Sequence, residues 1–241
     1  MTTTQQAAPA FTARVEYAKR DRLRFIGHLD TARLIVRAVR AAGLPARYTS
    51  GHSPHLDTSF GPPLALGHTG GSEFFDVRLT EAMGPAAIHE ALGAHVPEGI
   101  EVRSVRLIPG KAGSLGMELN RAEYVVILPA GAAIAAEAVE RFLASNRVVV
   151  ERKRGGRDKA VNVRQYVERL AMFDEPEGGT RLEMAIVLTP EGSTNPEEVL
   201  GALGGGEAAP GVRIHRKRLY HYAAGGEPTE EANAERSGHV S

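Results

Sequence analysis

The alternation of apolar and polar residues predicts short strands in the first part of the chain. Residues 11–17, 73–79 and 100–107 alternate as strands do when one face is buried. A helical spacing begins at Asp30 and runs to the stop signal at residues 43–45, and Pro85 opens a second helix. Residues 48–71 are dense in Gly, Pro, Ser and His and predict irregular loop with short extended pieces. The expected order is therefore β-α-β-β-α-β.

The second part of the chain repeats this order. Strands are expected at residues 122–128, 148–152, 181–188 and 212–222, and helices at residues 132–144 and 197–203. We therefore predict an α+β protein built from two tandem ferredoxin-like (βαββαβ) halves with antiparallel sheets. The expected parts are a mobile N-terminal tail (1–10), a first half (11–109), a linker (110–120), a second half (121–222) and a disordered acidic tail (223–241).

The composition excludes several classes of chemistry. The sequence has no cysteine, so it has no disulfide, no thiolate zinc site, no iron-sulfur cluster on its own cysteines and no cysteine nucleophile. We therefore expect no cofactor. The first ten residues do not resemble a signal peptide, and no apolar stretch is long enough to cross a bilayer, so we expect a cytoplasmic protein without a membrane partner.

Positive charge gathers in the second half, although the formal net charge of the chain is zero. Flexible cations beside the glycine pair at residues 155–156 suit phosphate oxygens, and an ordinary solvated turn is the alternative. A second basic run at residues 213–218, in the last expected strand, favours a nucleic-acid surface. The candidate RNA-binding residues are Arg152, Lys153, Arg154, Arg157, Lys159, Arg164, Arg216 and Lys217.

Histidines in the first half are the candidates for catalysis. His28 and His55 could serve as a general acid or base because the usual imidazole pKa lies near neutrality. His52 and His55 have an H-x-x-H spacing, but no helix presents them together, so we expect hydrogen bonds to backbone or contact with a ligand, and no metal. Asp30 is expected to cap the first helix. The candidate ligand-contacting residues of this region are Asp30, Tyr48, His52 and His55.

The first half contains several ordered motifs: LRFIGHLD at residues 23–30, YTSGHSPH at 48–55, SFGPPL at 59–64 and EFFD at 73–76. Together they resemble the radical SAM-linked protein family. Members of that family are similar to partners of radical SAM proteins, encoded beside them or fused to them. The resemblance therefore implies a radical SAM protein as partner and an accessory role, because any cluster and radical chemistry must come from elsewhere.

Together, the basic segments and the resemblance predict an accessory RNA-binding protein. It would act with a radical SAM enzyme and present or recognise an RNA substrate. Two alternatives remain open: a protein-docking module for the radical SAM partner without RNA contact, and a histidine-dependent RNA endonuclease. The sequence does not decide whether the protein is an enzyme, and a non-catalytic role is the expectation.

Overall fold

The structure is a computed structural model that describes residues 11–110, 112–132, 134–154, 157–176, 178–205 and 210–222, without the side chains of residues 153, 154 and 157. It is an α+β fold with two compact units, Met1–Glu118 and Leu119–Ser241. The division falls inside the segment 110–120. The two predicted tails, 1–10 and 223–241, lie outside the described residues.

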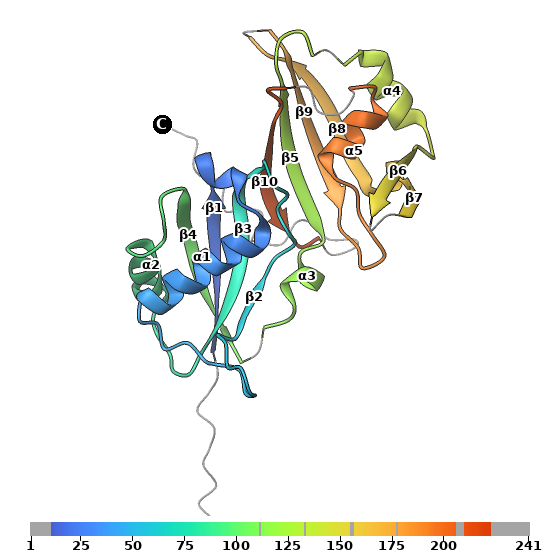
Figure 1. Ribbon diagram of the computed structural model, residues 1–241. Helices are drawn as coiled ribbons and strands as arrows, with labels where there is room; N and C mark the ends of the chain where they lie inside the picture. The colour runs from blue at the N-terminus through green and yellow to red at the C-terminus, as the bar shows by residue number, and fades with distance from the viewer. Residues whose placement is uncertain are drawn as a thin grey trace, which may run out of the picture. The chain divides into compact units, whose positions relative to one another are not determined.

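In the first unit, helices cover one face of an antiparallel sheet (Figure 1). The strand order is β4-β1-β3, with β2 pairing on β3, and every one of these pairs is antiparallel. The elements in chain order are β1 (Phe11–Lys19), the 3-10 helix η1 (Asp21–Phe25), α1 (His28–Ala41), β2 (Thr58–Phe60), β3 (Thr69–Leu79), α2 (Pro85–Gly93), β4 (Ile100–Pro109) and the short α3 (Leu115–Glu118).

The two faces of this sheet differ in chemistry. Successive side chains of a strand point to opposite faces, so Val15 and Val77 join the core with Ile35 of α1 and Ile88 of α2. Arg14 and Asp76 point to the opposite face, away from α1 and α2, and both are buried. Burial of the apolar face stabilises the unit, whereas the opposite face holds polar and charged groups.

The start of α1 corrects one prediction. Asp30 was expected as the N-cap, but α1 begins at His28. Its N-cap is Gly27, which has no side chain to make a capping hydrogen bond. The chain is extended at Ile26 and Gly27 and becomes helical at His28, two residues earlier than the apolar spacing indicates. Asp30 lies instead in the first turn, where it accepts a hydrogen bond from Arg33 at 2.7 Å. Its negative charge there still interacts favourably with the helix dipole.

The second unit also has an antiparallel sheet, but its elements differ from the predicted order. A strand at Val167–Asp174, which the pattern did not predict, completes the sheet, and the strand expected at residues 148–152 lies in a separate hairpin. The strand order of the sheet is β10-β5-β9-β8, again with antiparallel pairs, and α4 and α5 supply Phe142 and Leu200 to the buried residues. The elements are β5 (Arg121–Leu128), α4 (Ala136–Ala144), β6 (Val149–Arg154), β7 (Arg157–Asn162), the 3-10 helix η2 (Arg164–Tyr166), β8 (Val167–Asp174), β9 (Thr180–Val187), α5 (Pro196–Ala202) and β10 (Arg213–Tyr220).

The strands β6 and β7 pair only with each other among the described residues and form a separate two-stranded hairpin (Figure 1). In this hairpin Arg152 lies opposite Lys159. A two-stranded hairpin alone is marginally stable in water. Its position must therefore be fixed by contacts at its base, which are described below.

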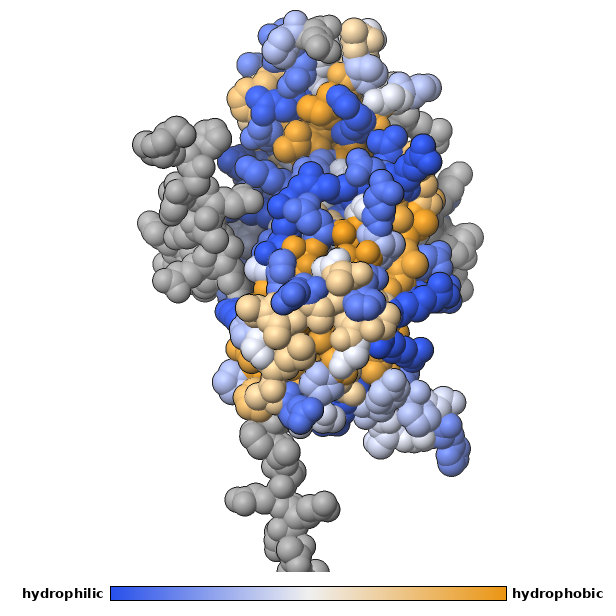
Figure 2. Space-filling model, turned by 90° about the vertical axis from the view of Figure 1, so that its left-hand side faces the viewer, coloured by the Kyte–Doolittle hydropathy of each residue, from blue (hydrophilic) through white to orange (hydrophobic). Residues whose placement is uncertain are grey.

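The surface over α2 is only weakly hydrophobic. Figure 2 views the side of the molecule on which α2 lies, and hydrophilic side chains are interspersed with hydrophobic ones over much of that face. The exposed residues of α2 and its C-cap include Ala86, Ala87 and Ala94. Within the part of the chain that is described, no helix combines the length and the apolar character that crossing a bilayer requires.

Candidate functional site

His28 packs against an aromatic ring at the start of α1. Its ring meets the ring of Phe60 edge-on, with centroids 6.0 Å apart, and Phe60 in turn stacks on the buried Phe75. The imidazole is half-buried. His28 is thus partly held by packing, and this position favours a structural contribution in addition to the acid–base role predicted from the sequence.

His55 is fixed within its own loop. Its Nδ1 lies 3.1 Å from the Oγ1 of Thr49 and 3.3 Å from the carbonyl oxygen of Ser53. Its backbone N–H donates to the Thr49 hydroxyl, and its carbonyl accepts from the Thr49 N–H. These described contacts do not join His55 to His28, so the two predicted catalytic histidines do not form a hydrogen-bonded pair.

The other predicted residues of this region lie at the surface. Tyr48 and His52 are exposed, and Asp30 is exposed on α1. Across the described residues, no group of three or more His, Asp or Glu side chains is placed to hold a metal ion. The loop therefore presents single polar groups, and what it contacts stays a prediction.

Arg152 anchors the cationic hairpin to α5. Its guanidinium donates to both carboxylate oxygens of Glu198, at 2.5 and 2.7 Å, and to the carbonyl oxygen of Ser193 at 2.8 Å. Thr194 donates a further hydrogen bond to Glu198 at 2.8 Å. Burial alone would raise the pKa of Glu198, but the hydrogen bonds from Arg152 and Thr194 lower it below its usual value. This network engages Arg152 inside the unit.

Two further cations of the predicted set also make internal contacts. Arg164 donates to the carbonyl oxygens of Val167 and Leu143. Arg216 is only 1% exposed, opposite Tyr124 in the sheet. Lys159 and Lys217 are exposed. The side chains of Lys153, Arg154 and Arg157 lie outside the described residues, so their role in RNA binding stays a prediction.

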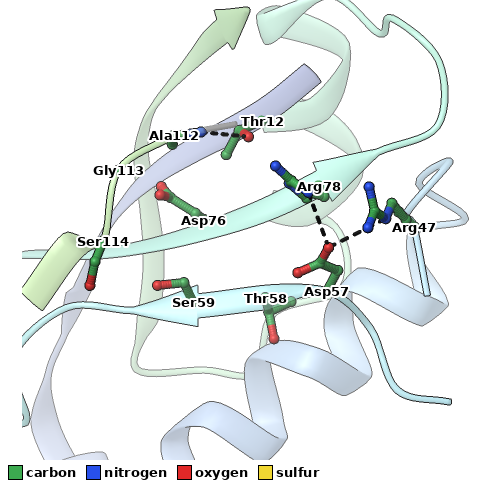
Figure 3. A pocket seen from close by; sticks show the side chains of 10 residues that line it. All are labelled: Thr12, Arg47, Asp57, Thr58, Ser59, Asp76, Arg78, Ala112, Gly113 and Ser114. Atoms are coloured by element: carbon green, nitrogen blue, oxygen red, sulfur yellow. Dashed lines mark hydrogen bonds and ion pairs between the residues drawn. The ribbon is translucent and has the colours of Figure 1, made fainter. Parts of the chain in front are cut away.

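A pocket of about 730 Å³ lies in the first unit (Figure 3). None of its lining residues is among the candidate site residues predicted from the sequence, although Ser59 and Asp76 belong to the motifs at 59–64 and 73–76. Arg47 comes from the loop after α1, Asp57 from the residue before β2, and Arg78 from β3. Ser59 of β2 and Ser114, just before α3, add hydroxyl groups. In Figure 3, Asp57 lies between the two arginines, and Ser59 and Ser114 lie on the other side of the pocket.

A ring of backbone hydrogen bonds holds the three charged residues together. The N–H of Arg47 donates to the carbonyl of Arg78 at 2.7 Å, the N–H of Asp57 to that of Arg47 at 2.9 Å, and the N–H of Arg78 to that of Asp57 at 3.0 Å. The side-chain contacts are looser. Asp57 lies 3.4 Å from Arg47 and 3.7 Å from Arg78, longer than charge-assisted hydrogen bonds, which measure about 2.7–2.9 Å.

Next to this pocket, Arg14 forms a tighter ion pair. It donates to both oxygens of Asp76, at 2.9 and 3.0 Å, and to Glu118 at 2.5 Å. Burial disfavours the charge of Arg14, but the hydrogen bonds to Asp76 and Glu118 outweigh this effect and raise its pKa further above the usual value. Arg14 therefore has a structural role, and it fixes the carboxylate of Asp76 at the wall of the pocket.

Sequence reasoning missed this pocket because its residues are far apart in the chain. The segment after Gly110 was expected to be a flexible linker, yet Ala112 donates from its backbone to the hydroxyl of Thr12, which itself donates to the carbonyl of Gly110. The segment thus packs on β1 and closes one side of the pocket. Only the pairing of β1, β2 and β3 brings these groups together.

The family is established by a match that covers most of the chain. Residues 12–196 match the family described as "Uncharacterized protein conserved in bacteria (DUF2344)". The chain belongs to this family. The description of DUF2344 does not mention radical SAM proteins, so that partnership stays a prediction. A comparison with curated proteins finds no match.

Solved structures with similarity to this DUF2344 member are distant. A Cbf5-Nop10-Gar1 complex matches with 7% identity and a TM-score of 0.44 over 86% of this chain and 48% of that chain. The archaeal box H/ACA sRNP Nop10-Cbf5 complex matches with 9% identity and a TM-score of 0.41 over 86% and 47%. The chain therefore spans about half the length of these proteins. An unknown protein from Galdieria sulphuraria has 19% identity and a TM-score of 0.24 over 89% and 99%. These TM-scores are too low to establish a common fold.

Proposed function

We propose that this protein is an accessory RNA-binding protein that acts with a radical SAM enzyme and presents or recognises an RNA substrate. The observation that carries the RNA part is the β6–β7 hairpin, whose sequence is cationic and whose base is fixed. Arg152 ties the hairpin to Glu198, and Asn162 accepts the backbone N–H of Val148 through its side-chain oxygen at 2.9 Å. Val161 and Val163 are buried beneath it.

A fixed base favours binding by the cations beyond it. Ordering a loop on association costs free energy, and a hairpin already held in place avoids part of that cost. Lys159 is exposed on β7. In the sequence, Lys153 and Arg154 come directly before the glycine pair, and Arg157 comes directly after it. Contacts of these cations with phosphate oxygens would release counterions, so binding would weaken as salt rises.

The test is RNA binding by a triple variant, Lys153→Ala, Arg154→Ala and Arg157→Ala. We expect weaker binding of a single-stranded oligoribonucleotide, and a salt dependence that falls by roughly 0.7 in logarithmic slope for each lost contact. The matched control removes the same charge from α1 with Arg33→Ala, Arg37→Ala and Arg40→Ala, which are exposed there. Absent binding, salt-independent binding, or equal losses in both triple variants would exclude the RNA role of the hairpin.

The partner part of the proposal rests on the resemblance of residues 23–30 and 48–55 to the radical SAM-linked family. Because the chain has no cysteine, a cluster for radical chemistry would belong to the partner. Co-purification of the two proteins at micromolar concentration is the expected outcome. If no complex forms, the partnership is wrong, and RNA binding by the hairpin can still be measured on the protein alone.

A second candidate function, docking to the partner without RNA contact, is favoured by one specific observation. Phe25, Leu29 and Leu66 are 65%, 69% and 65% exposed. The segments of Phe25 and Leu66 meet, because the N–H of Gly67 donates to the carbonyl of Arg24 at 2.7 Å. Leu29 follows Phe25 by four residues. Large apolar side chains gathered on a surface are typical of interaction sites. Replacing Phe25, Leu29 and Leu66 by Ser would abolish co-purification without changing RNA binding if this function holds.

We further propose that each unit is a ferredoxin-like half. The support is the strand order, in which the first strand of each unit lies between the last strand and the last but one, and all pairs are antiparallel. Separate expression of residues 11–118 and 119–222 would test this layout. Each piece would give a cooperative unfolding transition, and a piece that stays unfolded would contradict it.

A further inference from the structure

The pocket of the first unit contains two arginines whose backbones are held in place. The carboxylate that they share does not use all of their N–H donors. Each guanidinium has five N–H donors. Asp57 is shared by Arg47 and Arg78 at 3.4 and 3.7 Å, and the described contacts include no hydrogen bond from either guanidinium to this carboxylate. Most of their donors are therefore available to another acceptor.

The contacts of Arg47 and Arg78 with Asp57 differ from those of Arg14 on the same face of the sheet, and this difference indicates their role. Arg14 meets Asp76 through two hydrogen bonds with good geometry and is buried, as structural ion pairs are. The guanidinium of Arg47 is 45% exposed and that of Arg78 is 15% exposed. One arginine thus lines the inside of the pocket, and the other stands at its opening, where it can turn toward an entering ligand.

The charge of the group favours an anion. Two arginines share one aspartate at this side of the pocket, and Asp76, the other carboxylate of the lining, is paired with Arg14. The arginine side of the pocket therefore keeps a positive charge in excess. Ser59 and Ser114 line the other side, together with Asp76, and their hydroxyl groups can donate to oxygen atoms (Figure 3). Arginine forks and hydroxyl groups together are the usual partners of phosphate oxygens.

The size of the pocket sets the class of the ligand. A volume of about 730 Å³ exceeds what a bare phosphate ion needs and lies within the roughly 300–1,000 Å³ of small-molecule sites. We propose that this pocket binds the phosphate monoester of a nucleotide, with Arg47 and Arg78 on the phosphate oxygens and Ser59 and Ser114 as further donors. The nucleotide can be free or can be the phosphorylated end of an RNA chain.

Asp57 has a defined role in this proposal. Its carboxylate offsets the repulsion between the two guanidinium groups, and it would repel the phosphate that replaces it as their acceptor. Removing its charge while keeping its shape, with Asp57→Asn, would therefore strengthen binding. A residue that only stabilised the fold would show the opposite effect or none.

The experiment is calorimetric titration of the full chain with AMP, inorganic phosphate, and a short oligouridylate with or without a 5′-phosphate. We expect saturable binding of AMP, a loss of about tenfold or more in Arg47→Ala, as for a lost hydrogen bond to a charged group, and a gain in Asp57→Asn. Arg33→Ala, which removes an exposed arginine paired with Asp30, is the control and leaves AMP binding unchanged. A preference for the 5′-phosphorylated over the unphosphorylated oligouridylate would identify the RNA end as the source.

Three results would overturn the proposal: no saturable binding of any of the four probes, equal losses in Arg47→Ala and Arg33→Ala, or weaker AMP binding in Asp57→Asn with an unchanged melting temperature. The titration does not depend on the hairpin, because AMP is a single nucleotide. The triple variant at residues 153, 154 and 157 would lose affinity for both oligouridylates and keep AMP binding. The two proposals can thus fail separately.

Discussion

Arg152 and Glu198 form a two-point ion pair that joins β6 to α5. The sequence places Arg152 among cations that contact RNA, whereas the structure gives its donors to Glu198 and to the carbonyl of Ser193. The role of Arg152 in the hairpin is therefore one of positioning.

Arg152→Ala is expected to lower the free energy of unfolding by about 2 kcal/mol, because hydrogen bonds to charged groups contribute about 1.5–3 kcal/mol. Urea unfolding followed by circular dichroism measures this change. Lys159→Ala removes the same charge from the opposite strand, where the side chain is exposed, and would change the free energy by less than about 0.5 kcal/mol. Equal effects of the two variants would contradict the anchoring role.

The same ion pair makes stability depend on pH at the acidic end. The pKa of Glu198 is lowered from its usual 4.5 in the folded protein, and hydrogen bonds from Arg218 likewise outweigh burial and lower the pKa of Glu123. Unfolded chains bind more protons at these groups, so their contribution is present above about pH 4.5 and is lost as the pH falls through the folded pKa values. The difference in unfolding free energy between the native protein and Glu198→Gln would shrink below pH 4.5. A difference that stays constant over that range would contradict this assignment.

Arg14→Met is expected to destabilise the first unit strongly. The substitution leaves the buried Asp76 without its partner, and breaking a buried pair in this way costs about 3–5 kcal/mol. Arg33→Met breaks the exposed pair with Asp30 and would cost about 0.2–1 kcal/mol. Thermal melting of both variants separates the two cases, and a mild effect of Arg14→Met would mean that the pair is not structural.

Two glycines of the second unit differ in the space around them. Gly131 and Gly179 both have positive φ, +88° and +112°, but a Cβ at Gly179 would meet the carbonyl oxygen of Leu128 at 2.5 Å, whereas one at Gly131 would meet nothing within 4 Å. Gly131→Ala would cost about 1 kcal/mol for backbone strain, and Gly179→Ala about 1–3 kcal/mol more for the steric conflict. Equal melting temperatures of the two variants would show that β5 moves freely at this turn.

Local patterns sufficed for most of the elements. Residues 11–17 and 73–79 alternate because one face of β1 and β3 lies on a hydrophobic core, and Pro85 begins α2 where its missing N–H has no partner to lose. The helix expected from residue 132 begins only at Ala136, because the chain turns at Gly131 with positive φ and Ala135 is still extended. Such starts depend on backbone geometry that apolar spacing does not record.

The contacts that define the candidate sites could not be predicted from the sequence, because they join residues that are far apart in the chain. Arg152 meets Glu198 across 46 positions, and Arg47 meets Asp57 and Arg78 only because backbone hydrogen bonds close a ring between three segments. A run of basic residues indicates positive charge, but it does not reveal which cations a distant carboxylate has already engaged. Arg216, inside a basic run, was likewise expected at the surface, but it lies opposite Tyr124 in the sheet and is buried.

β4 ends the strand order of the first unit on the side away from β3. Its exposed residues include Glu101, Arg103 and Arg106, and the strand finishes at Pro109, which has no N–H to offer. A strand of a second molecule that tried to extend the sheet there would bring charged side chains together and would lack one hydrogen bond. The edge strand β4 therefore disfavours edge-to-edge aggregation of the protein at high concentration.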